Sequence, residues 1–138
     1  MVKQTKFKNL IILILLIFAI LFVACVPTTS GVTIITSSEA YEMMNNLDDF
    51  VLIDVRTSNE FRQQRIEGAI NIPHNEIVYW AENNQLSNYP ISKDAVILVY
   101  CQSGNRSRTA SRQLSGLGFT NVHDFGGINS WPFGIISG

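Results

Sequence analysis

One stretch of the chain joins a cysteine to small, polar and basic residues. It consists of Cys101, Gln102, Ser103, Gly104, Asn105, Arg106 and Ser107. An apolar run precedes it and a helical pattern follows, so the cysteine lies where the first N–H groups of a helix have no internal partners and can stabilise an anion. The same N–H groups lower the pKa of a thiol below its free value of about 8.5. The stretch therefore predicts a nucleophilic thiolate at Cys101.

The residues between Cys101 and Arg106 suit a loop that encloses an anion. Residues 103–105 are small or tolerate unusual backbone angles, so the chain can curl and direct successive N–H groups to one point. Arg106 closes the loop, and Arg108 and Arg112 follow on one face of the helix. We expect the backbone N–H groups from 102 to 107 and the Arg106 side chain to bind a small oxyanion.

Two other interpretations of Cys101 stay open. Free cysteines are often inert core residues, although a core position is rarely followed by five residues that are all polar or glycine. The chain has two cysteines, and in an oxidising compartment Cys25 and Cys101 could form a disulfide. Lipidation of Cys25 would leave Cys101 as a lone thiol.

A second polar group follows the apolar run 50–53. Asp54 either orients an arginine at the site or caps loop N–H groups, and in both cases it has a supporting role. Arg56 either reaches the mouth of the site or pairs with Glu60 in a solvated ion pair at a helix start. The two histidines, His74 and His123, lie far apart in sequence, so we expect no metal site.

The elements that position these residues indicate an α/β fold. Runs 50–53 and 95–100 have the continuous apolar character of strands buried on both faces. Shorter strands are expected at 32–35, 69–72 and 121–125, and helices at 37–46, 58–64, 75–83 and 107–117, the first capped by Ser37 and Ser38. A mainly parallel sheet flanked by helices follows. Asp54 and Cys101 would then face one crevice at the carboxyl ends of the strands.

The first residues of the chain have the features of an export signal. Three lysines up to Lys8 precede the uncharged apolar run from Leu10 to Ala24, which is shorter than the roughly 20 residues needed to span a bilayer. Residues 21–25 resemble the lipobox of bacterial lipoproteins, in which a cysteine becomes lipidated and then N-terminal. Cys25 is that cysteine in this sequence. We expect a signal peptide at 1–24, a tether at 25–31 and one domain at 32–138.

Two alternatives to a lipoprotein signal remain: cleavage elsewhere near Ala24, and an uncleaved anchor. All three place the domain outside the cytoplasm, and the first places it on the extracytoplasmic face of a bacterial membrane, because the positive end stays inside. The chain of 138 residues has a formal net charge of −1 at pH 7. This charge gives no indication of nucleic-acid binding.

Five sequence blocks, from about Ile34 to Trp131, resemble a known family when taken in order. They are Ile53-Asp54-Val55-Arg56 with Glu60-Phe61, Gly68-Ala69-Ile70-Asn71-Ile72-Pro73, the run 101–107, Leu114 with Gly118-Phe119, and Val122 with Gly126-Gly127 and Trp131. This order resembles the rhodanese family. Two segments depart from the family pattern: Arg65-Ile66-Glu67, and the short stretch after Trp131.

The resemblance implies a three-layer α/β domain and a sulfurtransferase without a cofactor. Cys101 would take a sulfane sulfur from thiosulfate or a persulfide and pass it to a thiol or a cyanide-like acceptor. Related phosphatases have a loop one residue longer, so the loop of this chain favours sulfur over phosphate. The alternative from another functional class is a membrane-tethered, non-catalytic binding or sulfur-sensing module.

Overall fold

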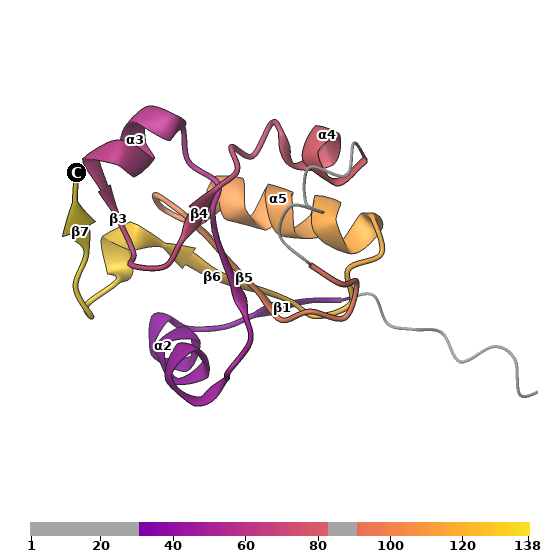
Figure 1. Ribbon diagram of the computed structural model, residues 1–138, viewed down its shortest axis with the longest axis horizontal. Helices are drawn as coiled ribbons and strands as arrows, with labels where there is room; N and C mark the ends of the chain where they lie inside the picture. The colour runs from indigo at the N-terminus through magenta and orange to yellow at the C-terminus, as the bar shows by residue number, and fades with distance from the viewer. Residues whose placement is uncertain (1–30, 83–90) are drawn as a thin grey trace, which may run out of the picture.

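A five-stranded parallel sheet forms the centre of the structure (Figure 1). The structure is a computed structural model that describes residues 31–82 and 91–138. Neighbouring strands run in the order β1-β6-β5-β2-β4, and every pair is parallel. The strands are β1 (Val32–Ile34), β2 (Val51–Asp54), β4 (Ile70–Asn71), β5 (Ile97–Cys101) and β6 (Val122–Gly127).

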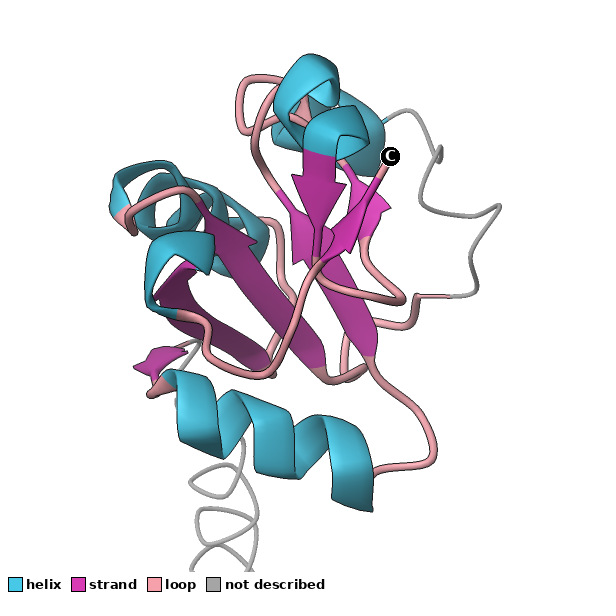
Figure 2. Ribbon diagram, turned by 90° about the vertical axis from the view of Figure 1, so that its left-hand side faces the viewer, coloured by secondary structure: helices cyan, strands magenta, loops and turns pink. Residues whose placement is uncertain are grey.

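Helices cover both faces of this sheet. Figure 1 shows α2 (Ser37–Asn46) on one face and α4 (Ile77–Glu82) with α5 (Asn105–Gly116) on the other, and Figure 2 shows the sheet between them. Side chains alternate along β5, so that Leu98 and Tyr100 belong to the core on the α2 side, whereas Val99 and Cys101 belong to the core on the α5 side. The predicted three-layer α/β arrangement is confirmed.

Two helices begin with a capping box. Thr36 precedes α2, where its hydroxyl accepts the Glu39 N–H at 3.2 Å and the Glu39 carboxylate accepts the Thr36 N–H at 2.7 Å. Thr57 and Glu60 make the same pair of bonds at the start of α3 (Ser58–Gln63). The predicted cap at Ser37 and Ser38 is wrong, because the chain is still extended at Thr36 and already helical at Ser37.

The helix after the cysteine starts earlier than predicted. Gly104 is the residue before α5 and has a φ of 103°, a left-handed conformation that glycine adopts at little cost. The chain therefore turns into the helix at Asn105 rather than at Ser107. As a result, Asn105, Arg106 and Ser107 lie in the first helical turn, where the backbone N–H groups have no helical partners.

The two segments that depart from the family pattern meet at Arg65, which pairs with Ile136. Strand β3 (Gln64–Arg65) and strand β7 (Ile136–Ser137) form a separate antiparallel pair. The N–H of Gly138 extends the pairing by donating to the carbonyl of Gln63 at 3.2 Å. A two-residue strand has too few residues for a recognisable alternation, which is why the sequence did not predict it.

The predicted signal peptide and the tether up to residue 30, with the lipidation site Cys25, lie outside the described residues. Within residues 31–82 and 91–138, no helix combines the length and the apolar character required to cross a membrane.

Candidate active site

Cys101 is the last residue of β5, and its side chain is 1% exposed. The N–H of Gly104 donates to its Sγ at 3.1 Å. Burial raises the pKa of the Cys101 thiol, but hydrogen bonds from the N–H groups of Ser107, Gly104 and Ser103 and from the Ser107 hydroxyl outweigh burial, so the pKa is lowered. The site thus favours the thiolate, which is the nucleophilic form of cysteine.

Two glycines at the end of β6 support the curled loop from behind. A Cβ at Gly127 would overlap the carbonyl oxygen of Gln102 and lie 2.7 Å from the Ser103 Cα. The carbonyl oxygen of Gly126 lies 3.1 Å from the Ser107 hydroxyl oxygen. Because any larger side chain at position 127 would displace the loop, the Gly-Gly pair permits the close approach of β6 to residues 102–107.

The Gln102 side chain makes hydrogen bonds within the protein. Its Oε1 accepts a hydrogen bond from Arg56 Nη1 at 3.2 Å, and its Nε2 donates to Asn129 Oδ1. The Asn129 N–H also donates to the Gln102 carbonyl at 3.2 Å. The sequence placed Gln102 among the substrate-binding residues through its backbone N–H, and this stays a prediction. It did not identify Asn129, whose position near the loop has no local sequence signal. The side chain of Gln102 anchors the loop.

Asp54 and Arg56 form a buried ion pair beneath this loop. Asp54 is 0% exposed and Arg56 is 1% exposed. The Asp54 carboxylate accepts hydrogen bonds from the backbone N–H, Nε and Nη2 of Arg56, with the ion pair at 2.7 Å. Arg56 Nη2 also donates to the Gln64 carbonyl at 2.6 Å. The structure shows both alternatives for Asp54, because its carboxylate orients the Arg56 side chain and also accepts a backbone N–H of the loop after β2.

Of the two alternatives for Arg56, the ion pair with Glu60 is wrong, because Arg56 pairs with Asp54 and Glu60 has a different partner. Both terminal nitrogens of Arg106 donate to the Glu60 carboxylate at 2.8 Å. Hydrogen bonds from Arg106 lower the pKa of Glu60 well below its usual range, and bonds from Thr57 lower it further, so Glu60 is ionised. The hydrogen bonds to Glu60 raise the pKa of Arg106, and the interaction of its guanidinium with Cys101 raises this pKa further.

Sequence reasoning did not count Glu60 among the site residues. Thr57 and Glu60 have the spacing of a capping box, which fixes the position of the carboxylate at the start of α3. That signal could have suggested a fixed anion after β2. It could not have shown that Arg106 lies opposite, since the two residues are 46 positions apart.

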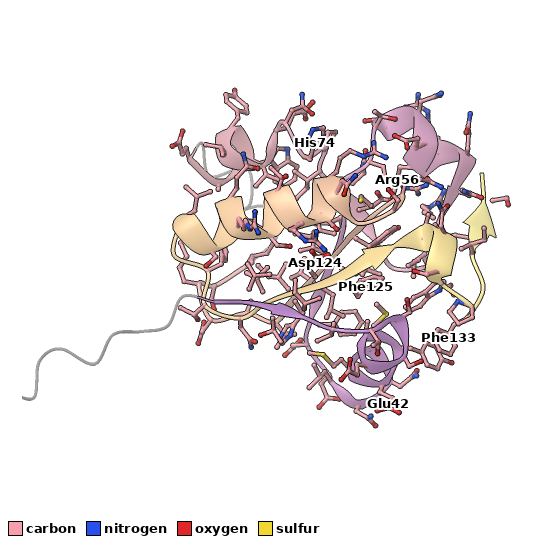
Figure 3. The ribbon with its side chains drawn as sticks, turned by 180° about the vertical axis from the view of Figure 1, so that it is seen from behind. Glu42, Arg56, His74, Asp124, Phe125 and Phe133 are labelled. Carbon is pink, nitrogen blue, oxygen red and sulfur yellow. The ribbon has the colours of Figure 1, made fainter. Side chains whose placement is uncertain are left out.

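The histidines and the acidic residues form no metal centre in the described part of the chain. Figure 3 shows Arg56 and His74 on one side of the sheet and Glu42 on the other. The backbone N–H of His74 donates to the carbonyl of Val55 at 3.0 Å. His123, in β6, lies with its Nε2 at 2.7 Å from Oδ1 of Asn121, the residue before that strand. Across residues 31–82 and 91–138, no three His, Cys, Asp or Glu residues gather closely enough to hold a metal ion.

Comparison with known proteins identifies relatives that share the greater part of this chain. The family model for the rhodanese-like domain matches residues 36–132, a span that includes every site residue described above. The thiosulfate sulfurtransferase PspE of Escherichia coli K12 is 34% identical over 86 residues, which are 62% of this chain and 78% of that protein. A solved structure of a rhodanese with anions from E. coli has 32% identity and a TM-score of 0.55, covering 64% of this chain and 98% of that chain.

One relative is much longer than the present chain. The adenylyltransferase and sulfurtransferase UBA4 of Meyerozyma guilliermondii is 32% identical over 93 residues. These residues are 66% of this chain and 22% of that protein. The similarity to UBA4 therefore concerns one part of a larger protein.

Proposed function

This chain belongs to the rhodanese-like domain family, and on that premise we propose that it is a sulfurtransferase in which Cys101 carries the sulfur as a persulfide. Relatives named as sulfurtransferases support a sulfur-transfer function. The observation that carries the proposal is the Cys101 Sγ, which accepts the Gly104 N–H at 3.1 Å and has a lowered pKa. A thiolate in a ring of N–H groups is suited to attack a sulfane sulfur.

The proposed reaction has two steps. The Cys101 thiolate forms a bond to the outer sulfur of thiosulfate or of a persulfide, and the bond from that sulfur to the rest of the donor breaks. Sulfite or a thiolate leaves with the electron pair. A thiol or a cyanide-like acceptor then attacks the outer sulfur of the persulfide, and Cys101 departs again as a thiolate. Neither step needs a cofactor.

The loop supplies stabilisation at both stages. Backbone N–H groups from Gln102 to Ser107 offset the negative charge of the thiolate and of the persulfide. Arg106 keeps N–H groups beyond the two that Glu60 accepts, because a guanidinium has five, and these bind the donor. The buried chain of Asp54, Arg56 and Gln102 supports the loop in this conformation.

The dimensions of the site favour sulfur over phosphate. Four residues separate Cys101 from Arg106, and the Cys101 side chain is 1% exposed. Only one sulfur atom has to enter the nearly closed loop around Cys101. A phosphate is larger and would require the loop residues 102–107 to move. We therefore expect no turnover of aryl phosphates.

Intact-mass measurement of the purified protein tests the proposal. After exposure to thiosulfate or a persulfide, the protein should gain the mass of one sulfur atom, and a reductant should remove it. Cys101→Ser should keep the fold and lose both the added mass and all sulfur transfer. A chain that no donor loads, and whose thiol resists alkylation at neutral pH, would instead favour the binding or sulfur-sensing module.

For the beginning of the chain we propose a lipoprotein signal at 1–24, lipidation of Cys25 and a tether at 25–31, which together place the domain on the extracytoplasmic face of a bacterial membrane. The lysines before Leu10 and the uncharged run up to Ala24 support this proposal. In a bacterial host, the full chain should be found in the membrane fraction with a lipid-modified N-terminus. Cys25→Ala should abolish the modification, and an unchanged membrane fraction and mass would contradict the proposal.

A further inference from the structure

Two arginines hold or close the Cys101 loop, Arg56 through Gln102 and Arg106 at its end, and a carboxylate compensates the charge of each. Arg56 is paired with Asp54 at 2.7 Å in the interior. Arg106 is paired with Glu60 at 2.8 Å through two parallel hydrogen bonds. The second pair is nearer to solvent, since its side chains are 27% and 30% exposed. Neither arginine therefore contributes an isolated positive charge to the site.

Glu60 is held in place independently of Arg106. Its Oε2 accepts the Thr57 N–H at 2.9 Å and the Thr57 hydroxyl at 2.6 Å, which closes the capping box of α3. A carboxylate tied to a helix start cannot follow Arg106 if the guanidinium turns toward a ligand. The negative charge of Glu60 thus stays beside the loop throughout the reaction.

The ion pair between Arg106 and Glu60 affects which donor charge the site accommodates. Thiosulfate enters as a dianion and leaves a dianion, sulfite, next to the persulfide. A thiol persulfide leaves a thiolate, whose reacting end has one negative charge. With Arg106 compensated, the loop N–H groups supply the main attraction for the donor, and this attraction is better matched to the smaller charge.

We propose that Glu60 determines the donor class of this site: by compensating Arg106, it favours persulfides of thiols over thiosulfate. The inference rests on the proposed sulfur-transfer function. In both reactions the Cys101 thiolate bonds to the terminal sulfur as the donor's S–S bond breaks, and the leaving group takes the electron pair. Only the charge that leaves differs.

Glu60→Gln is the decisive variant, because glutamine also completes a capping box and preserves the helix start. The variant removes one negative charge next to Arg106. We expect kcat/KM with thiosulfate to rise about tenfold relative to kcat/KM with glutathione persulfide. The gain should shrink toward 1 M salt, where the Debye length is about 3 Å.

Two further variants make the comparison specific. Glu42→Gln removes the same charge from an exposed position on the other side of the sheet (Figure 3) and should leave the donor ratio unchanged. In Glu60→Gln/Arg106→Gln the gain should disappear, because the released charge belongs to Arg106. The readout is the ratio of the two kcat/KM values, so a change in the reactivity of the Cys101 thiol that affects both donors equally leaves the ratio unchanged.

The outcomes separate the inference from the proposed function. If persulfide and thiosulfate both load Cys101 and the donor ratio is the same in wild type and Glu60→Gln, the role of Glu60 is refuted while sulfur transfer stands. A fall in the ratio has the same meaning. If neither donor loads wild-type Cys101, the proposed function fails and the inference fails with it.

Discussion

Replacement of Asp54 by Asn should destabilise the fold through Arg56. The Asp54 carboxylate accepts hydrogen bonds from the backbone N–H, Nε and Nη2 of Arg56 at 2.7 to 3.0 Å, and both side chains are at most 1% exposed. Asparagine has almost the same shape but leaves the guanidinium buried without a counter-charge. Breaking a buried pair in this way costs about 3–5 kcal/mol, a large share of the roughly 5–15 kcal/mol that stabilises a domain.

Urea unfolding followed by far-UV circular dichroism and tryptophan fluorescence measures this cost. With a slope of about 2 kcal/mol per molar urea, the midpoint for Asp54→Asn should fall by about 2 M. Asp48→Asn is the matched control, because Asp48 is exposed in the turn before β2, and it should leave the midpoint unchanged.

A second variant keeps the reasoning testable if Asp54→Asn does not fold. Asp54→Asn/Arg56→Leu removes the uncompensated charge as well, so it should be more stable than the single variant. The interpretation is refuted if Asp54→Asn lowers the midpoint no more than Asp48→Asn, or if the double variant is less stable than the single one.

Three further predictions concern the loop. The alkylation rate of Cys101 should reach half its maximum at a lower pH than the alkylation rate of an ordinary cysteine, because the pKa of Cys101 is lowered and its thiolate forms earlier as pH rises. Ser107→Ala should move this midpoint to a higher pH, and an unchanged midpoint would show that the Ser107 hydroxyl does not lower the pKa of Cys101. Gly127→Ala should reduce sulfur loading at least tenfold, because the new Cβ overlaps the Gln102 carbonyl; loading at the wild-type rate would show that the loop adapts without cost. Arg106→Ala should mainly raise the KM for the donor in steady-state assays, and an unchanged KM would exclude Arg106 from donor binding.

Much of the fold followed from local patterns in the sequence. The apolar runs 50–53 and 95–100 predicted the two central strands within one or two residues of β2 and β5, because strands buried on both faces have few polar positions. The cysteine at the end of one such run, followed by small and polar residues, predicted the position of the Cys101 loop. These features depend on neighbours in sequence, and a sequence pattern records them directly.

Only the tertiary structure decided which charges meet. A solvated ion pair between Arg56 and Glu60 at a helix start was one of the two alternatives for Arg56. Asp54 is fully buried and binds the arginine instead, since an unpaired buried charge is far more costly than a lost surface pair. Glu60 was therefore available to Arg106, from which it is 46 residues distant. The Gly127 contact with the loop likewise depends on β6 lying beside β5. Such partners are set by the packing of distant elements and by the cost of burying charge, which no spacing along the chain expresses.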